Sequence, residues 1–336
     1  MSHPAHLQHE SDVSDSLEML SVLFKAAGDP LRLEVLRVLQ NDTFGVLELS
    51  NIFEVRQSGM SHHLKVLSSA GLLETQREGN SIFYRRPIYR RDDLANDVAQ
   101  TFYELIDRIP LPASIVERVQ QIRDQRAEQS QAFFTRYADK FREQQELIAN
   151  YELYAEPTRQ LLFTTPFDTD ASALEIGPGE GAFLKTLAPS FKTVYALDNS
   201  EKMLAKARLF AQQEKLHNIE FMLGETRQAL DKGIKVDAII LNMVLHHVSS
   251  PADIFKDSAK LLNPRGCLVV SDLSLHDQHW VRENCGDIWL GFDSSELTEW
   301  ASKAGFEEED SLYIGLRNGF QIQIKKFIYL GGAACT

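Results

Sequence analysis

The chain has 336 residues, of which 43% are apolar and 25% are charged, the composition of an ordinary globular protein with two or three domains. A formal net charge of −13 argues against general affinity for nucleic acid, so a DNA-binding surface would have to be a local basic patch. Three widely spaced cysteines exclude a disulfide scaffold, and no apolar run approaches the roughly 18 residues of a membrane span, so we expect a cytoplasmic chain with no secretory signal and no membrane contact.

Residues 1–15 are polar and are expected to form a disordered tail that carries His3, His6 and His9. Residues 16–90 follow as a compact unit. Apolar residues recur there at helical spacing in four stretches, which are residues 17–24, 31–39, 46–53 and 57–70. Gly71 is the expected C-cap of the fourth. Two alternating runs at 72–76 and 81–85, separated by Glu78-Gly79-Asn80, predict a β-hairpin.

This order of elements is the layout of a winged helix-turn-helix, in which the second helix of the pair lies in the DNA major groove. In the helix predicted over 57–70, Met60, Leu64 and Leu67 share one face and should pack inward. The predicted DNA contacts of this helix are polar or basic donors suited to base edges and phosphates, namely Gln57, Ser58, Ser61, His62 and Lys65.

A local basic charge supports this interpretation. Residues 55–91 hold seven basic and two acidic residues, a net charge of +5 within an acidic chain. Arg77 and Arg85 flank the hairpin turn, where a wing would meet the DNA backbone, and are also predicted DNA contacts.

Two stretches carry a family resemblance. Asp29-Pro-Leu-Arg-Leu-Glu-Val-Leu36 and Gln57-Ser-Gly-Met-Ser-His-His-Leu-Lys-Val-Leu67 resemble the ArsR/SmtB family of bacterial dimeric repressors. The resemblance covers about residues 16–90 and implies a homodimer that reads a palindromic operator in double-stranded DNA, with half-sites about one helical turn apart. Metal sensors of the family often carry cysteines on the helix before the recognition helix. The matching residues 46–53 have none, and soft metals need thiolate or imidazole ligands, so we expect no metal.

Residues 91–150 are expected to be helical and highly charged, with a break at Pro110 and Pro112. An apolar stripe within 91–109 predicts a dimer seam, and residues 113–150 are interpreted as a linker and lid. The alternative is a solvated connecting helix.

Residues 151–330 are expected to form the second domain, in which strands and helices alternate from residue 170 onward, and residues 331–336 are expected to form a short tail. The predicted strands are residues 173–176, 193–197, 219–223, 236–241, 266–272, 311–315 and 321–329. This alternation predicts an α/β domain with a mostly parallel sheet.

The first of these strands runs into a glycine-rich loop. Gly177, Gly179 and Gly181 permit a tight turn and a close approach of a ligand to the backbone. Asp198 ends the next strand, where a carboxylate accepts hydrogen bonds from ribose hydroxyls. The spacing also fits a dinucleotide loop for NAD, but Glu175 would repel a pyrophosphate and attract an ammonium or sulfonium group.

The segments Glu175-x-Gly-x-Gly-x-Gly181, Asp198-Asn-Ser-Glu-Lys-Met-Leu204 and Asn242 to Val248 together resemble class I S-adenosylmethionine-dependent methyltransferases. The resemblance implies a Rossmann-like sheet with strand order 3-2-1-4-5-7-6, whose last strand is antiparallel. It also implies S-adenosylmethionine or S-adenosylhomocysteine as the ligand.

By motif position, the resemblance assigns ligand-binding roles to ten residues. Glu175 and the three glycines would hold the methionine portion, and Asp198 the ribose. Asn199 and Met203 would contact the adenine faces, and Glu225, with its neighbour Thr226, the adenine edge. Asn242 would line the floor of the cleft. Glu225 stands where many members carry aspartate. Phe133-Phe134-x-x-Tyr137 resembles the N-terminal lid helix of these enzymes.

The fusion of the two domains suggests a one-component regulator. It is similar to S-adenosylhomocysteine-responsive repressors of methionine and methyl-cycle genes in Proteobacteria. We therefore expect a repressor whose methyltransferase-like domain senses the adenosyl ligand.

Two alternatives stay open. The first is an active small-molecule methyltransferase with an autoregulatory DNA-binding domain. Methyl transfer depends mainly on positioning, and His246 and His247 are the candidates for a general base. The second alternative is a structural protein that binds neither DNA nor ligand.

Overall fold

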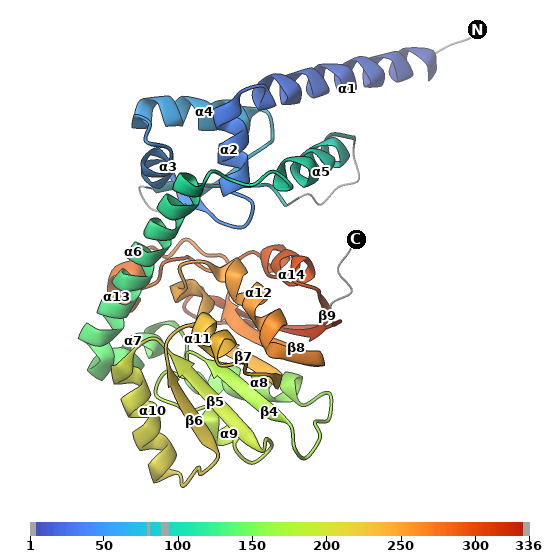
Figure 1. The fold of residues 1–336 in the computed structure, drawn as a ribbon. Coiled ribbons are helices and arrows are strands. Elements are labelled where there is room, and N and C mark those ends of the chain that lie inside the picture. The colour runs from blue at the N-terminus through green and yellow to red at the C-terminus, as the bar shows by residue number, and fades with distance from the viewer. Residues whose placement is uncertain (1–4, 79–80, 89–93, 332–336) are drawn as a thin grey trace. The chain divides into compact units, whose positions relative to one another are not determined.

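The computed structural model describes residues 5–78, 81–88 and 94–331. It divides into two compact units, Met1–Arg123 and Asp124–Thr336, which we describe in turn (Figure 1). The boundary falls inside helix α6 (Ala113–Tyr137), so this one helix begins in the first unit and ends in the second. The tail expected at 331–336 lies outside the described residues apart from Gly331.

The first unit is a winged helix-turn-helix. In chain order its elements before α6 are α1 (Ala5–Ala27), α2 (Pro30–Val38), β1 (Phe44–Gly45), α3 (Val46–Phe53), α4 (Gln57–Ser69), β2 (Glu74–Glu78), β3 (Ser81–Arg85) and α5 (Leu94–Asp107). The four predicted helices are present. Helix α1 begins at Ala5, so it also covers most of the stretch expected to be a disordered tail, because no glycine or proline interrupts it before Gly28.

Local sequence sets the ends of these helices. Asp29 caps α2, since its carboxylate accepts a hydrogen bond from the Arg32 N–H at 3.1 Å, and Pro30 occupies the first helical position. Gly71, with φ of +72°, follows α4 and takes the left-handed conformation that ends a helix.

The wing is an antiparallel hairpin in which Glu74 of β2 lies opposite Arg85 of β3, as predicted, although β2 begins two residues later than expected. The predicted turn at residues 79–80 lies outside the described part of the chain. Strand β1 adds a third strand by pairing Phe44 with Tyr84. Two residues are too few to leave a strand pattern in the sequence.

The core of the first unit holds the recognition helix α4 in place. Met60, Leu64 and Leu67 are fully buried, and α4 packs against α1, α2 and α3, which confirms the predicted inward face. Full burial of a side chain of this size contributes about 1.5–3 kcal/mol, so these three residues fix which face of α4 points outward.

The second unit is built on a seven-stranded sheet. After α6 its elements are η1 (Ala138–Lys140), α7 (Phe141–Ile148), α8 (Tyr151–Leu162), β4 (Ser172–Ile176), α9 (Leu184–Leu187), β5 (Thr193–Asp198), α10 (Glu201–Gln213), β6 (Ile219–Leu223), α11 (Thr226–Asp231), β7 (Val236–Asn242), η2 (Leu245–His247), α12 (Pro251–Leu261), β8 (Leu262–Leu273), α13 (Trp280–Cys285), α14 (Ser294–Lys303), β9 (Phe306–Gly315) and β10 (Gln321–Tyr329).

The strand order is β6-β5-β4-β7-β8-β10-β9, and β10 is antiparallel to both of its neighbours. This is the predicted order 3-2-1-4-5-7-6. Strands β4 and β7 are parallel neighbours at which the order of adding strands reverses, from β4-β5-β6 on one side to β7-β8 on the other. Ligands of open α/β sheets bind beside the carboxyl ends of the strands at such a switch point.

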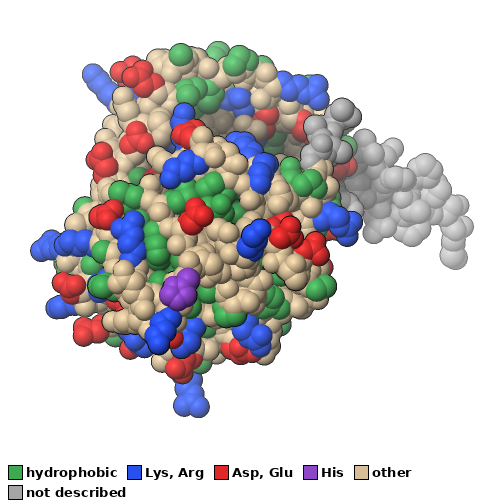
Figure 2. Space-filling model, turned by 60° about the horizontal axis from the view of Figure 1, so that its bottom comes forward, with side chains coloured by type: hydrophobic (Ala, Val, Ile, Leu, Met, Phe, Trp, Pro, Cys, Tyr) green, Lys and Arg blue, Asp and Glu red, His purple; other side chains and the backbone are tan. Residues whose placement is uncertain are grey.

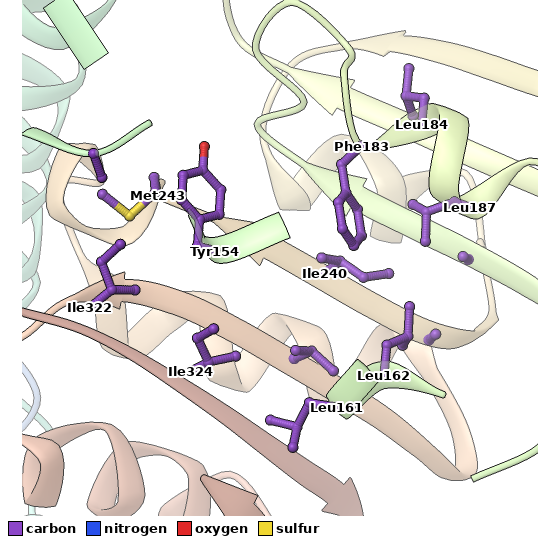
Figure 3. Packing of buried hydrophobic residues seen from close by; sticks show 14 of the residues in the cluster. Tyr154, Leu161, Leu162, Phe183, Leu184, Leu187, Ile240, Met243, Ile322 and Ile324 are labelled. Atoms are coloured by element: carbon purple, nitrogen blue, oxygen red, sulfur yellow. The ribbon is translucent and has the colours of Figure 1, made fainter. Parts of the chain in front are cut away.

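Side chains of the central strands alternate between the two faces of the sheet. Ala238 and Ile240 of β7 belong to a buried cluster with Leu162 of α8 and Phe183. Figure 3 places Phe183 directly beside Ile240. Glu175 lies two residues after Ala173, which belongs to the same cluster, so its carboxyl group enters the sheet face that α8 covers.

No helix in the described part of the chain is both long and apolar enough to cross a membrane. On the face drawn in Figure 2, acidic and basic side chains are interspersed. The excess negative charge of the chain is therefore not gathered into one block on that face.

Candidate functional site

The outward face of α4 carries every residue predicted to contact DNA from this helix. Gln57, Ser58, Ser61, His62 and Lys65 are all exposed. Their donors are held on a rigid helix whose other face is buried, which is the arrangement that direct reading of base edges requires.

The basic residues of the wing divide into two kinds. Arg77 is exposed, and the partly buried Arg85 lies 3.3 Å from the Glu74 carboxylate. Arg86 serves the fold, since its guanidinium donates to the Leu36 carbonyl at 2.8 Å and to both carboxylate oxygens of Asp107 at 2.7 and 2.9 Å. Arg86 therefore does not belong to the free basic surface, although it counts toward the charge of the segment.

The glycine loop of the second unit has the backbone shape that the sequence predicted. Gly177, Gly179 and Gly181 have φ of +66°, +58° and +89°, a region that side chains disfavour. A Cβ atom at Gly177 would lie 2.7 Å from a methyl group of Val244. The loop after β4 thus packs directly on the segment after β7, and glycine is required at that contact.

Glu175 is the most deeply buried acid of the predicted site, with 1% of its surface exposed. Burial raises its pKa to about 8, which the nearby Asn242 amide opposes and the Asp198 charge reinforces. Its Oε2 atom has no hydrogen-bond partner among the described residues, and neither polar atom of the Asn242 side chain has one. The Asn242 amide is close enough to Glu175 to lower its pKa, but none of these three buried atoms makes a hydrogen bond of normal geometry within the described residues.

Asp198 ends β5 in a polar turn. Its Oδ1 atom accepts the Ser200 N–H at 2.8 Å. Burial raises its pKa to about 6 against hydrogen bonds from the Ser200 and Gly179 backbone. Asn199 follows it, and Met203 is buried on the first turn of α10. The acid, the amide residue and the thioether therefore meet at the carboxyl end of β5.

Glu225 and Thr226 begin α11, next to the end of β6. Glu225 is exposed, and its backbone N–H donates to Gln228 Oε1 at 2.7 Å. Thr226 is buried, and its hydroxyl donates to Asp257 Oδ2 at 2.7 Å. The Thr226 proton is therefore used within the fold. Glu225 is exposed as a residue, but partial burial of its carboxyl and the nearby Asp124 and Asp257 raise its pKa.

The C-terminal part of α6 lies along this edge of the sheet. Gln131 Nε2 donates to the Asn199 carbonyl at 2.8 Å, and the Phe134 ring meets the His247 ring edge to face at 4.8 Å between centroids. The segment interpreted as a lid from the sequence thus touches both the β5 turn and the segment after β7.

His246 and His247 both lie in η2, directly after β7. His246 Nδ1 is 2.7 Å from Asp272 Oδ1, and Asp272 is fully buried at the end of β8. The sequence analysis missed Asp272, although it ends a predicted strand and the rule applied to Asp198 would have found it. It also missed Tyr154, which is buried. Burial raises the pKa of its hydroxyl, and the nearby Tyr151 and Glu175 raise it further.

Comparison with known proteins identifies both units. A family model described as a methyltransferase domain matches residues 141–310. The chain belongs to this methyltransferase family. A model described as a helix-turn-helix domain matches residues 27–76, so the fusion expected from the sequence is confirmed.

Among curated proteins, an uncharacterised HTH-type transcriptional regulator of Methanocaldococcus jannaschii is 33% identical over 92 residues, which are 27% of this chain and 99% of that protein. The mitochondrial ubiquinone biosynthesis O-methyltransferase of Arabidopsis thaliana is 31% identical over 102 residues, 30% of this chain and 32% of the enzyme. The chain thus spans about a third of the length of that methyltransferase.

Solved structures with a similar fold include the magnesium protoporphyrin IX methyltransferase of Synechocystis with bound S-adenosylhomocysteine. It is 19% identical and covers 60% of this chain and 99% of its own, with a TM-score of 0.48. The two family models, and not this likeness, show that the chain combines a helix-turn-helix domain with a methyltransferase domain.

Proposed function

We propose that the chain is a cytoplasmic, homodimeric transcriptional repressor of methionine or methyl-cycle genes, and that its methyltransferase domain senses S-adenosylhomocysteine or S-adenosylmethionine. Binding of the adenosyl ligand would change the affinity of the recognition helix α4 for a palindromic operator. The family match and the exposed donor face of α4 support the DNA-binding and methyltransferase-like parts of this proposal.

The main support for an adenosyl ligand is a set of buried polar atoms beside the glycine loop that lack hydrogen-bond partners. Glu175 Oε2 and both side-chain polar atoms of Asn242 are buried without partners in the described structure. Burying such atoms unpaired costs about 1–3 kcal/mol each, and a ligand with an ammonium group and a carboxylate would satisfy them. Adenosylhomocysteine offers both groups, with a ribose for Asp198.

Apolar side chains that the first unit leaves exposed support a homodimer. Helices α1 and α5 contact one another, and both present large apolar residues to solvent, which are Leu17, Val22, Phe24, Leu94 and Leu105. Adjacent exposed apolar residues of this kind mark interaction surfaces, and the predicted dimer seam includes α5.

Helix α6 is a continuous segment through which ligand binding in the second unit could affect the DNA-binding unit. Ile115 and Ile122 are buried in the core of the first unit, and Arg118 donates to the Ile52 carbonyl at the end of α3. Further along the same helix, Gln131 and Phe134 contact the β5 turn and His247. A ligand that prefers one position of the C-terminal part of α6 would therefore bias the segment that packs on α3.

Fluorescence anisotropy with DNA selected by the protein itself tests the proposal. Saturating S-adenosylhomocysteine should change the dissociation constant for this DNA at least fivefold, the lower end of typical coupling. The Asp198→Asn variant should bind the DNA normally and lose the response. If saturating ligand, with its binding verified by calorimetry, leaves the DNA isotherm unmoved, the sensor function is wrong.

A second experiment tests the route through α6. The Gln121→Gly/Gln125→Gly variant changes two exposed positions on either side of the unit boundary, and glycine weakens a helix by about 1 kcal/mol per site. We expect both ligand and DNA to bind with unchanged affinity and the coupling between them to fall. The Gln121→Ala/Gln125→Ala variant is the matched control and should keep the full response.

One observation favours the active enzyme as a second candidate. The hydrogen bond from His246 Nδ1 to Asp272 would fix the orientation of the ring. Although burial lowers the pKa of His246, the Asp272 and Asp287 carboxylates raise it to about 9, so the ring would act as a general base mainly above neutral pH. Incubation with methyl-labelled S-adenosylmethionine and metabolite extract should then transfer label to a small molecule. Retention of all label on the donor would exclude this candidate and leave the sensor proposal untouched.

A further inference from the structure

A second group of buried polar side chains lies beyond the residues assigned to the adenosyl ligand. It comprises His246 and His247 of η2, Asp272 at the end of β8, and Asp287 in the loop after α13. One possible ligand atom from each of His246, His247 and Asp287 lies within 4.8 Å of the other two. His246, Asp272 and Asp287 expose 2%, 0% and 4% of their surfaces.

Asp287 is the member of the group whose environment is incomplete. Both of its carboxylate oxygens are buried, and neither makes a hydrogen bond within the described structure. Its Oδ1 atom lies 3.9 Å from His247 Nδ1, too far for a hydrogen bond, and burial raises the pKa of the carboxyl to about 7. An unpaired buried carboxylate is strongly unfavourable, and buried polar groups in native proteins are otherwise nearly always paired. Asp287 therefore points to a binding partner that completes this site.

The two histidines already have the contacts that orient metal-binding imidazoles. His246 Nδ1 is 2.7 Å from Asp272 Oδ1, and Asp272 is itself held by the backbone N–H groups of Leu245 and Leu273, both at 2.8 Å. His247 Nδ1 lies 3.2 Å from the Gly286 carbonyl. Because a carbonyl only accepts, that nitrogen carries the proton and Nε2 keeps its lone pair.

Metal-binding histidines almost always donate a hydrogen bond from their second ring N–H to a carboxylate or a backbone carbonyl in this way. We propose that His246, His247 and Asp287 bind one divalent first-row transition cation, with Asp272 as the outer partner that orients His246. Two imidazoles and one carboxylate are a ligand set for Zn²⁺ or Fe²⁺ that leaves further coordination positions open.

Distance and charge both fit a cation of this kind. Metal–ligand bonds of about 2.0–2.2 Å place ligand atoms about 3–4 Å apart, against the 4.8 Å within which one atom of each residue lies. His247 Nδ1, the nitrogen that faces the Gly286 carbonyl, is also 3.9 Å from Asp287 Oδ1, so metal binding through Nε2 requires this ring to shift as the site contracts. The two carboxylates balance a charge of +2. The expectation of no metal rested on the lack of cysteine in residues 46–53 and of histidine in residues 91–109, and it did not consider these residues of the second unit.

The competing explanation is a buried ion cluster without metal. Burial lowers the pKa of His246, but the Asp272 and Asp287 carboxylates outweigh it and raise this pKa to about 9. A protonated His246 would then supply the positive charge between the two carboxylates. The two explanations differ in whether the site exchanges that proton for a cation.

Full-length protein without an added histidine tag, freed of metal by chelation and dialysis, is titrated with Co²⁺ and followed by its visible absorption. We expect one Co²⁺ per chain. Asp287→Asn should weaken binding at least tenfold, and Asp272→Asn should weaken it by about 10–100-fold, the range for outer partners of metal ligands. The triple variant His3→Ala/His6→Ala/His9→Ala controls for binding at the N-terminal histidines and should bind Co²⁺ as the wild type does.

X-ray absorption at the zinc edge of the reloaded wild type gives a measurement that needs no variant. It should report nitrogen and oxygen ligands with an imidazole signature and no sulfur. Failure of the wild type to bind Co²⁺, equal binding by Asp287→Asn, or loss of binding in the triple variant would overturn the metal site. Calorimetry with S-adenosylhomocysteine on the same samples reports separately on the adenosyl site.

Discussion

Glu175 should give up a proton when an adenosyl amino acid binds. With a pKa of about 8 in the ligand-free site, this carboxyl group is about 90% protonated at pH 7. An ammonium group within about 4–6 Å lowers a carboxyl pKa by about 1–3 units. Binding of S-adenosylhomocysteine at pH 7 should therefore release about 0.4–0.9 proton, and release should fall to about 0.2 at pH 8.5.

Isothermal titration calorimetry measures this proton. Apparent binding enthalpies in phosphate and Tris buffers at one pH differ by the number of protons released times the difference in buffer ionisation enthalpy. The Glu175→Gln variant should lose the release, and Glu220→Gln, which changes an exposed acid on β6, should keep it. Binding without proton release at pH 7, or equal release from Glu175→Gln, would refute the assignment of Glu175 to the ammonium group.

The same group makes a prediction for stability. A carboxyl whose folded pKa lies above its ordinary value binds more protons in the folded state, so the free energy of unfolding falls as pH rises from about 4.5 to about 8. At about 1.4 kcal/mol per unit of pKa difference, the loss is on the order of 4 kcal/mol, and Glu175→Gln should lack it. Urea unfolding at pH 5 and pH 8.5 measures the difference, and tryptophan fluorescence reports on the second unit alone because all three tryptophans lie there.

Three further substitutions test the fold and the DNA surface. Gly177→Ala should lower the affinity for S-adenosylhomocysteine at least tenfold and destabilise the second unit by about 1–3 kcal/mol, because the new Cβ would meet Val244. Gly233 also has a positive φ, +67°, but lies in open space. As the control, Gly233→Ala should lower the free energy of unfolding by about 1 kcal/mol and leave ligand binding, measured by calorimetry, intact. Lys65→Ala should weaken DNA binding and reduce its salt dependence by about one phosphate contact, whereas Lys185→Ala in the second unit should do neither in an anisotropy assay. Arg86→Ala should destabilise the first unit by about 2–4 kcal/mol in thermal unfolding, because it leaves the Asp107 carboxylate without this partner.

The parts of the site that sequence predicted are those that periodicity and strand ends determine. Asp198 and Asn242 end strands whose apolar runs are continuous, and parallel strands bring their carboxyl ends to one edge of the sheet. The inward face of α4 followed in the same way from residues three and four apart. Strand order required the family resemblance, since local sequence does not specify which strands become neighbours.

The parts that sequence did not predict depend on contacts between distant segments. Asp287 lies in a loop with no periodic pattern, and only the fold brings it to His246. Arg86 counted as basic surface until its partner Asp107, 21 residues later, was known. The role of a charged residue is set by its nearest opposite charge, which composition cannot locate.

The ion pair between Arg86 and Asp107 would affect the spacing of the two wings if two copies of this chain bind one operator. Arg86 directly follows the wing, and Asp107 is the last residue of α5, with Arg37 of α2 bound to the same carboxylate at 2.9 Å. These hydrogen bonds therefore join the base of the wing to the end of α5. In a dimer joined through α5, any change in how the two copies of that helix cross would alter the spacing between the wings on the duplex, and a shift of a few ångströms there would take one wing out of register with its phosphates.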